Sequence, residues 1–278
     1  MYNKKLQELK LRKLIALDLD GTLLNWRKKI TKRTIDALEK AQQQGHVVMI
    51  ATGRPFESSL KHAVTVKVDK YGGFISNFNG GLITNIKTNE IISDTKFEIN
   101  LLKEIIEFID ELCVDYSILH DKNLYTNYHS KWLFRLYRKA IGQNVIKDDR
   151  HFDKINFSVN KILLNDSMKN LKITRKLIEE KFKGKLEISF SSSVSIEITP
   201  ANTSKGRSVL KVAEKLGIPR EDTIAFGNYG NDISMITLCG TGVAMKNSSK
   251  ELIKVADYVT DTNNRDGIAK YLEKYVLK

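Results

Sequence analysis

Apolar runs alternate with amphipathic segments in the first and last parts of the chain. Residues 14–19 form an apolar run, and residues 31–44 follow it with apolar side chains at helical spacing, between a capping residue, Thr31, and a stop, Gly45. A second apolar run lies at 47–52. Strands that are apolar throughout and separated by helices are typical of a buried parallel sheet. The series is expected to continue with a helix near 57–64, a strand at 73–77, a helix after Ser204, a strand at 223–228 and a helix from about Asp232.

The middle of the chain, after Gly80 and Gly81, has a different pattern. Its predicted elements are hairpins at 82–93 and 185–199, strands at 116–120, 123–128 and 154–159, and helices at 100–112 (capped by Asn100) and near 167–182. We therefore predict an α/β fold class: a doubly wound parallel-sheet (Rossmann-like) core made of residues 1–81 and 194–278. An α+β domain is expected to be inserted into it at 82–193.

The composition excludes several classes of protein. Of 278 residues, 41% are hydrophobic and 28% are charged, which excludes a disordered, collagen-like or polytopic membrane chain. No apolar run approaches the ~18 residues that span a bilayer, and the first residues lack the apolar region of a signal peptide. Cys113 and Cys239 lie far apart, and the five His residues show no HxxxH spacing, so neither a redox pair nor a zinc site is expected. We expect a cytoplasmic protein.

The net charge of +13 is compatible with nucleic acid, an anionic membrane or acidic metabolites as partners. Lys outnumbers Arg by 35 to 11, which disfavours nucleic acid because Arg makes most bidentate phosphate and base contacts. Residues 132–141 are basic and amphipathic, but a ten-residue segment fits a helix face better than a membrane anchor. We predict a small phosphorylated metabolite as partner, with no nucleic acid and no membrane, and a monomer or weak homodimer.

Two carboxylates stand where the first apolar run ends, in the sequence DLDGT. Asp18 and Asp20 would lie at the carboxyl end of a parallel strand, which is where ligands bind in open α/β sheets. Acids so close repel each other unless a cation or a shared proton is present, and an oxygen-ligated cation such as Mg²⁺ suits them. One carboxylate could then attack phosphorus and the other could move a proton. The alternative is a plain turn in which Asp is a turn former.

Three further segments carry polar residues at predicted strand or helix ends. Thr52 and Gly53 offer a hydroxyl and a backbone N–H to phosphoryl oxygens, although a simple Thr-Gly turn also fits them. Lys205 is placed at the positive end of a helix, a conflict that a bound anion would relieve. The segment 226–232, FGNYGND, ends a strand with amide and acid side chains suited to a cation or a phosphate.

Together these segments resemble the haloacid dehalogenase superfamily of phosphohydrolases, specifically its Cof-type branch. DLDGTLL, ATGRP, a Lys near TSKG and GNYGNDISM follow that family's order and spacing, as does the tail, GVAMKNSSKELIKVADYVT followed by DGIAKYL. The resemblance spans residues 13–79 and 197–272. The insert matches the Cof-type cap domain in position and size. The resemblance implies Mg²⁺-dependent hydrolysis of small phosphate monoesters, such as sugar phosphates, nucleotides or phosphorylated cofactors, with the cap excluding water.

The resemblance also implies roles for single residues. Asp18 would be the nucleophile that forms an aspartyl-phosphate and a ligand of Mg²⁺. Asp20 would be the general acid and then the base, with its backbone carbonyl on the metal. Thr52 and Lys205 would orient and neutralise the phosphoryl group. The substrate-binding set would be Gly53, Arg54, Asn79 and Asn231, and the metal set would be Asp18, Asp20, Asn228 and Asp232.

Asn228 departs from the family pattern, which has a metal-ligating Asp at this position of GDxxND. An amide oxygen can ligate Mg²⁺ but adds no negative charge, so we expect weaker metal binding. This departure leaves open a phosphometabolite-binding protein with weak or no turnover. A phosphomutase, which would use the same core, is a second alternative to a phosphatase. No GxxxxGK[ST] or GxSxG motif occurs, which argues against a P-loop kinase and an α/β-hydrolase esterase.

Overall fold

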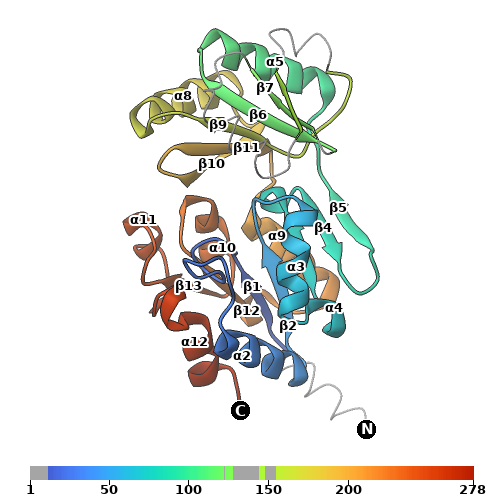
Figure 1. The fold of residues 1–278 in the computed structure, drawn as a ribbon, viewed down its shortest axis with the longest axis vertical. Coiled ribbons are helices and arrows are strands. Elements are labelled where there is room, and N and C mark those ends of the chain that lie inside the picture. The colour runs from blue at the N-terminus through green and yellow to red at the C-terminus, as the bar shows by residue number, and fades with distance from the viewer. Residues whose placement is uncertain (1–11, 122, 128–143, 148–154) are drawn as a thin grey trace. The chain divides into compact units, whose positions relative to one another are not determined.

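The computed structural model describes residues 12–121, 123–127, 144–147 and 155–278 (Figure 1). It forms two compact units, each considered by itself below. Unit 1 consists of Met1–Asp94 and Thr203–Lys278, and unit 2 consists of Thr95–Asn202. The segment 132–141, which the sequence analysis treated as a helix face, lies outside the described residues.

The units divide at other residues than the 81/82 and 193/194 boundaries expected from the sequence. The hairpin of β4 (Leu82–Asn85) and β5 (Ile91–Asp94) belongs to unit 1 because β4 pairs with the core strand β3 (Phe74–Asn77). At the other end, β11 (Ser195–Pro200) belongs to unit 2 because it hydrogen-bonds to strands on both of its sides. Because of this backbone pairing, the units divide after β5 at one end of the insert and after β11 at the other.

Unit 1 is built on an eight-stranded sheet with the order β14-β13-β12-β1-β2-β3-β4-β5. Its first six strands in this order are parallel, and β4 and β5 are antiparallel additions at one edge. The remaining bounds are β1 Leu14–Leu17, β2 Val47–Ala51, β12 Thr223–Gly227, β13 Thr241–Met245 and β14 Tyr258–Thr260. The parallel core and the hairpin predicted at 82–93 are confirmed.

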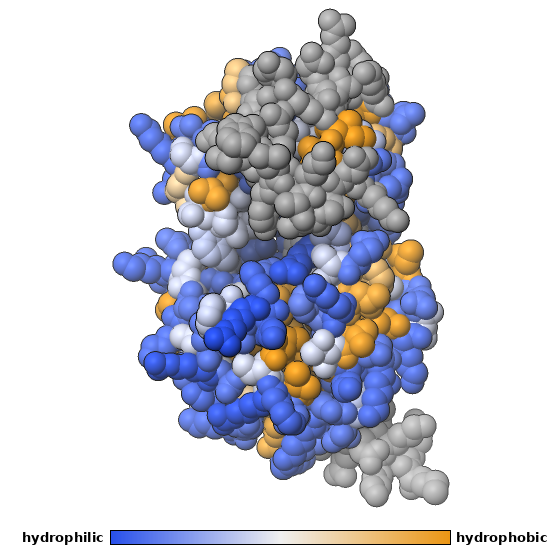
Figure 2. Space-filling model, viewed as in Figure 1, coloured by the Kyte–Doolittle hydropathy of each residue, from blue (hydrophilic) through white to orange (hydrophobic). Residues whose placement is uncertain are grey.

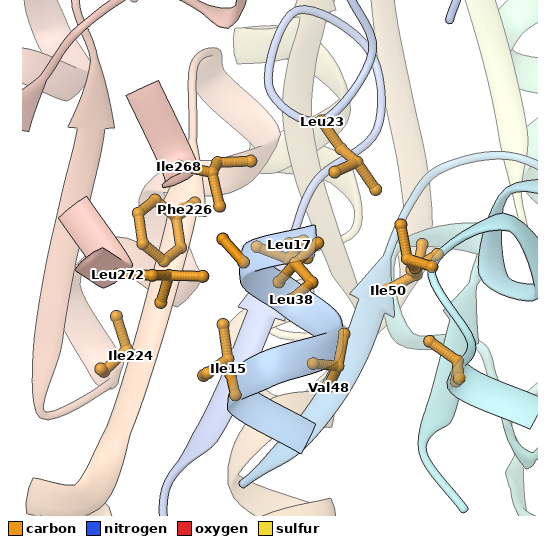
Figure 3. Packing of buried hydrophobic residues seen from close by; sticks show 14 of the residues in the cluster. Ile15, Leu17, Leu23, Leu38, Val48, Ile50, Ile224, Phe226, Ile268 and Leu272 are labelled. Atoms are coloured by element: carbon orange, nitrogen blue, oxygen red, sulfur yellow. The ribbon is translucent and has the colours of Figure 1, made fainter. Parts of the chain in front are cut away.

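The central strand β1 is buried on both faces, as its uninterrupted apolar sequence predicts. Ile15 and Leu17 face one layer, with Leu38 of a helix and Phe226 of β12 among their neighbours in one apolar cluster (Figure 3). The alternate residues Leu14 and Ala16 join a second cluster on the opposite face. Helices therefore cover both faces of the sheet, which makes unit 1 the doubly wound α/β core that the sequence predicted.

The first layer holds α2, α3 and α12, and the second holds α9, α10 and α11. The helix bounds in unit 1 are α2 Lys32–Gln43, α3 Phe56–Thr65, α4 Val68–Tyr71, α9 Lys205–Leu216, α10 Ile233–Leu238, α11 Lys250–Ile253 and α12 Gly267–Tyr275, with short 3-10 turns at Phe78–Gly80, Arg220–Asp222, Gly230–Asp232 and Asn263–Arg265. Thr31 caps α2 as predicted, because its side chain accepts a hydrogen bond from the backbone of Thr34. On the face of unit 1 that Figure 2 displays, hydrophilic residues predominate and apolar residues gather in smaller areas.

Unit 2 is a six-stranded sheet with the order β10-β11-β9-β6-β7-β8 and two described helices. Apolar residues of both helices and of three central strands form one cluster, so the helices pack on the same face of the sheet. The bounds are α5 Ile99–Glu111, β6 Asp115–His120, β7 Asn123–Thr126, β8 Asn144–Lys147, β9 Ile162–Asn165, α8 Met168–Lys181 and β10 Leu186–Ser192. The α+β class predicted for this part is confirmed.

Two local predictions in unit 2 are wrong. Residues 155–159 form no strand, and the strand of this region is β9, which starts at Ile162 and pairs with both β6 and β11. The cap of α5 is Glu98, whose carboxylate accepts a hydrogen bond from the backbone N–H of Leu101, and Asn100 lies inside the helix. A carboxylate at this place also suits the positive end of the helix. Among the described residues, no helix is both long and apolar enough to cross a membrane.

Candidate active site

Asp18 occupies the point of unit 1 where the strand order reverses. β1 has β12 on one side and β2 on the other, so a crevice is expected at the carboxyl end of β1. The backbone N–H of Asp18 donates to the carbonyl oxygen of Phe226 at 3.1 Å, which holds the residue against the neighbouring strand. The Asp18 residue is only 5% exposed. The sheet therefore places one carboxylate in a buried position at the site where α/β proteins bind ligands.

A buried lysine connects Asp18 to the fourth motif. Nζ of Lys205 lies 2.7 Å from Oδ1 of Asp18 and 2.6 Å from Oδ1 of Asp232, and all three residues are at most 5% exposed. Lys205 is the first residue of α9, whose cap is Ser204. Two carboxylates and one ammonium leave this buried group with one excess negative charge. Burying such a group is costly unless a further cation or a proton joins it.

The pKa of Asp18 reflects the cost of burying this group. Burial, together with the charge of Asp232 and against the opposing effect of Lys205, raises the pKa of Asp18 to about 7. Burial alone would lower the pKa of Lys205, but the two carboxylates outweigh it and raise that pKa above its ordinary value. Lys205 is therefore a permanent cation beside Asp18. A second cation at the site would return Asp18 to its ionised form.

Both carboxylate oxygens of Asp232 accept hydrogen bonds. Its Oδ1 accepts from Lys205, and its Oδ2 accepts from the backbone N–H groups of Asn228 at 2.8 Å and Tyr229 at 3.1 Å. Gly227 makes this approach possible, because a Cβ there would lie 2.5 Å from the Cβ of Asp232. Asp232 thus positions both the lysine and the loop that carries Asn228.

The side chain of Asn228 lies against the DLDGT loop. Its Oδ1 accepts a hydrogen bond from the hydroxyl of Thr22 at 3.2 Å. Gly21 has φ +81°, and a Cβ there would lie 2.3 Å from Nδ2 of Asn228, so a larger residue would strain the turn and displace the Asn228 side chain. The structure therefore brings the first and fourth motifs together, as the sequence analysis expected of a shared site.

Asp20 is held differently from Asp18. Arg54 donates hydrogen bonds to both carboxylate oxygens of Asp20, with Nε–Oδ2 and Nη2–Oδ1 distances of 2.7 Å. Nζ of Lys28 lies 2.8 Å from Oδ1 of the same carboxylate. Partial burial would raise the pKa of Asp20, but the hydrogen bonds from Arg54 and Lys28 outweigh it and lower that pKa to about 2. In this arrangement Asp20 is ionised at neutral pH.

The second motif meets the fourth through Asn79. The hydroxyl of the buried Thr52 accepts from the backbone N–H of Arg54 at 3.2 Å, and the Thr52 carbonyl accepts from the backbone of Asn79 at 3.0 Å. Nδ2 of Asn231 donates to Oδ1 of Asn79 at 3.3 Å. Asn79 has φ +56°, a conformation that Asn tolerates better than most residues. With Gly53 between Thr52 and Arg54, the predicted substrate-binding residues all lie in unit 1.

The oxygen atoms at this place suit a hard divalent cation. The residues that could hold such an ion are Asp18, through its carboxylate, and Asn228, whose side-chain oxygen contacts Thr22 of the same loop, and Mg²⁺ prefers oxygen ligands. Among the described residues, no group of three or more His, Cys, Asp or Glu side chains could hold a metal ion. The chemistry of these oxygens fits Mg²⁺, and a cation there would favour the ionised form of Asp18, whose pKa is raised by burial and by the charge of Asp232.

The sequence analysis missed two residues of the site. Lys28 follows Asp20 by eight positions, and this spacing does not predict an ion pair between the two residues. Asn77 is fully buried, and its Nδ2 donates to the backbone carbonyl of Arg54 at 2.9 Å and to the hydroxyl of Ser59 at 2.8 Å. Asn77 ends β3, so the rule that polar residues at strand ends form the site could have found it.

The chain is similar to known proteins along nearly its whole length. A family model described as haloacid dehalogenase-like hydrolase matches residues 15–272. The chain is 32% identical to the 5-amino-6-(5-phospho-D-ribitylamino)uracil phosphatase YcsE of Bacillus subtilis, over 95% of this chain and 96% of that protein. It is 27% identical to a second phosphatase of that name and organism, YitU, over 94% of this chain and 97% of the relative. Among solved structures, a haloacid dehalogenase-like hydrolase from Bacteroides thetaiotaomicron has a TM-score of 0.79 and 29% identity, covering 95% of this chain and 99% of the other.

Proposed function

Because the chain belongs to the haloacid dehalogenase-like hydrolase family, and is therefore a phosphoric monoester hydrolase, we propose that it cleaves small phosphate monoesters with Mg²⁺ as cofactor. The reaction would pass through an aspartyl-phosphate on Asp18. The observation that carries the proposal is the buried contact of 2.7 Å between Lys205 and Asp18 at the carboxyl end of β1. It supports the proposal because a carboxylate that could act as nucleophile lies beside a permanent cation at the strand end where this kind of fold binds ligands.

The roles of the two residues follow from their contacts. Within the described part of the chain, Lys205 contacts only Oδ1 of the Asp18 carboxylate, so Oδ2 is the oxygen that would attack phosphorus. The ammonium of Lys205 and the hydroxyl of Thr52 would neutralise and orient the phosphoryl oxygens. Phosphoryl transfer depends mainly on such positioning and charge neutralisation. Asp232 would keep Lys205 and the Asn228 loop in place.

Asp20 would move the protons. Its ionised form is suited to accept a proton from the water that hydrolyses the aspartyl-phosphate. Protonating the leaving oxygen requires the acid form, which the contacts from Arg54 and Lys28 disfavour. We therefore expect Asp20 to leave these two cations before it acts as a general acid.

Mg²⁺ would be held by the carboxylate of Asp18, the backbone carbonyl of Asp20 and the side chain of Asn228. When bound, it would supply positive charge that keeps Asp18 ionised and that neutralises phosphoryl oxygens. Asp232, whose oxygens already accept three hydrogen bonds, would support this set from behind.

The neutral side chain of Asn228 supports a second candidate function. A neutral side chain in the metal set leaves the cation with one carboxylate less, which supports a protein that binds phosphorylated metabolites with weak turnover. The substrate proposed for either function is a small phosphorylated metabolite, such as a sugar phosphate, a nucleotide or a phosphorylated cofactor. A phosphoribityl compound, as in the names of YcsE and YitU, belongs to this class. We expect the protein to act in the cytoplasm as a monomer or weak homodimer.

Phosphate release from a panel of monoesters, with and without Mg²⁺, tests the proposal. Asp18→Asn is expected to abolish turnover while the circular dichroism spectrum is retained, and rapid quench of the wild type should trap labelled phosphate on Asp18. The matched control is Asp36→Asn, which removes an exposed acid paired with Lys32 and should leave the rate unchanged. Measurable turnover without any acyl-phosphate would refute the mechanism, and binding of esters without turnover would favour the binding protein.

A further inference from the structure

Two cations converge on one carboxylate beside the nucleophile. The guanidinium of Arg54 spans both oxygens of Asp20, the bidentate geometry that matches a carboxylate best. Lys28 adds a second positive charge at 2.8 Å. The guanidinium of Arg54 already pairs with both oxygens of Asp20, so the ammonium of Lys28 is a second positive charge at a carboxylate that has a partner.

A rigid hairpin presents Lys28. The backbone N–H of Asn25 donates to the carbonyl of Lys29, and the N–H of Lys28 donates to the carbonyl of Asn25, both at 2.9 Å. Oδ1 of Asn25 accepts from the N–H of Lys29 at 3.0 Å. The hairpin is anchored to a distant loop because Oδ1 of Asn264 accepts from the N–H of Trp26 at 2.9 Å. These bonds hold Lys28 at φ +56°.

Lys28 is still open to a ligand. Its side chain is 67% exposed, and within the described residues it donates to Asp20 alone, although an ammonium group has three donors. An ion pair as exposed as this one contributes little to stability. The ion pair between Lys28 and Asp20 therefore stabilises the fold too little to explain why a lysine occupies a strained position next to the DLDGT loop.

We infer that Lys28 selects substrates whose leaving group carries a second anion, either a carboxylate or a second phosphate. This inference rests on the proposed function, since it assigns the specificity of the same site. Asp18 and Asp20 are two residues apart, so their Cα atoms are separated by at most about 7 Å. A second anion joined to the phosphoryl group through a chain of about four carbons would reach Lys28 while phosphorus lies at Asp18.

Phosphonates, whose C–P bond is not hydrolysed as an ester, test the inference independently of turnover. Calorimetry in Mg²⁺ would compare 5-phosphonopentanoate, its neutral isostere 5-phosphonopentanamide, and 1,5-pentanebisphosphonate. The proteins are the wild type, Lys28→Gln and the control Lys29→Gln, which removes the same charge from the same hairpin. The carboxylate and bisphosphonate arms distinguish the two kinds of second anion.

We expect the wild type and Lys29→Gln to bind at least one doubly anionic ligand more tightly than the amide, by about two- to fivefold. Lys28→Gln should lose that preference, with a smaller effect on the amide than on the doubly anionic ligands. Equal weakening of all three ligands by Lys28→Gln, equal effects of the two variants, or no preference in the wild type would overturn the inference. Failure of the proposed function is distinguishable, because it appears as absent phosphate release from every ester of the panel.

Discussion

Replacing Asn228 by Asp should tighten Mg²⁺ binding. The change adds a carboxylate where the side chain contacts Thr22 beside the DLDGT loop. At a separation of about 5 Å and an effective dielectric constant of about 20, a carboxylate and a divalent ion attract by roughly 6 kcal/mol. Repulsion from Asp18 at about 6 Å opposes this by roughly 3 kcal/mol, and desolvation takes a further share. A net gain of about 1–2 kcal/mol remains, which corresponds to a five- to thirtyfold lower Kd for Mg²⁺.

The same change should have the opposite effect without metal. Asp18 and Asp232 already share a single lysine, so a third carboxylate is expected to lower the free energy of unfolding of the metal-free protein by about 1–2 kcal/mol. Thermal melts with and without Mg²⁺ measure this, and a Mg²⁺ titration followed by the phosphatase rate measures the affinity. Asp232→Asn should weaken metal binding more in the present sequence than in Asn228→Asp.

Asn264→Asp is the matched control. It adds the same charge at an exposed position and keeps an oxygen that can accept the hydrogen bond from Trp26. Solvent and salt screen an exposed charge, so the Kd for Mg²⁺ should change by less than about twofold. If Asn228→Asp leaves metal affinity, metal-free stability and rate as they are, Asn228 lies outside the metal set and its proposed role is wrong.

Three other predictions concern Lys205, Asp18 and unit 2. Lys205→Met leaves two buried carboxylates without a cation and should cost about 3–5 kcal/mol in chemical denaturation, whereas Lys215→Met, which breaks an exposed pair on the same helix, should cost less than about 1 kcal/mol; equal losses would contradict the argument. Because the folded pKa of Asp18 is about 7 and the ordinary value is 3.8, its contribution to metal-free stability is complete below pH 3.8 and is lost as the pH rises through about 7. The expected loss is on the order of 2–4 kcal/mol, and Asp18→Asn should flatten this part of a stability–pH curve; a wild-type curve of the same slope as the variant would count against the raised pKa. Exchanging residues 95–202 for the corresponding segment of a relative should alter the ranking of hydrolysed esters and keep the Mg²⁺ requirement, and an unchanged ranking would argue against unit 2 as the specificity element.

Local patterns in the sequence determined the sheet core and the segments that carry the candidate site. Apolar runs such as 14–19 and 47–52, separated by a helix, are typical of a parallel sheet that is covered on both faces, and that sheet is observed. Asp18, Thr52 and Asn228 stand at the ends of such runs, and the order and spacing of their motifs resemble one family, so the sequence could assign them to one site. These features depend on spacing along the chain, so a single sequence expresses them.

Tertiary structure decided which charges meet. Lys205 contacts Asp18 across 187 positions and Asp232 across 27, and only the packing of α9 against the sheet brings their charged atoms within 2.7 Å. The grip of Arg54 and Lys28 on Asp20 likewise depends on the turn at 25–29 and on the end of β2. Long-range pairing also placed the hairpin 82–94 in unit 1 and the strand of the 155–165 region at β9. Residue type and spacing alone do not predict these individual contacts. The reason is that the free energy of each contact depends on what the rest of the fold places beside it.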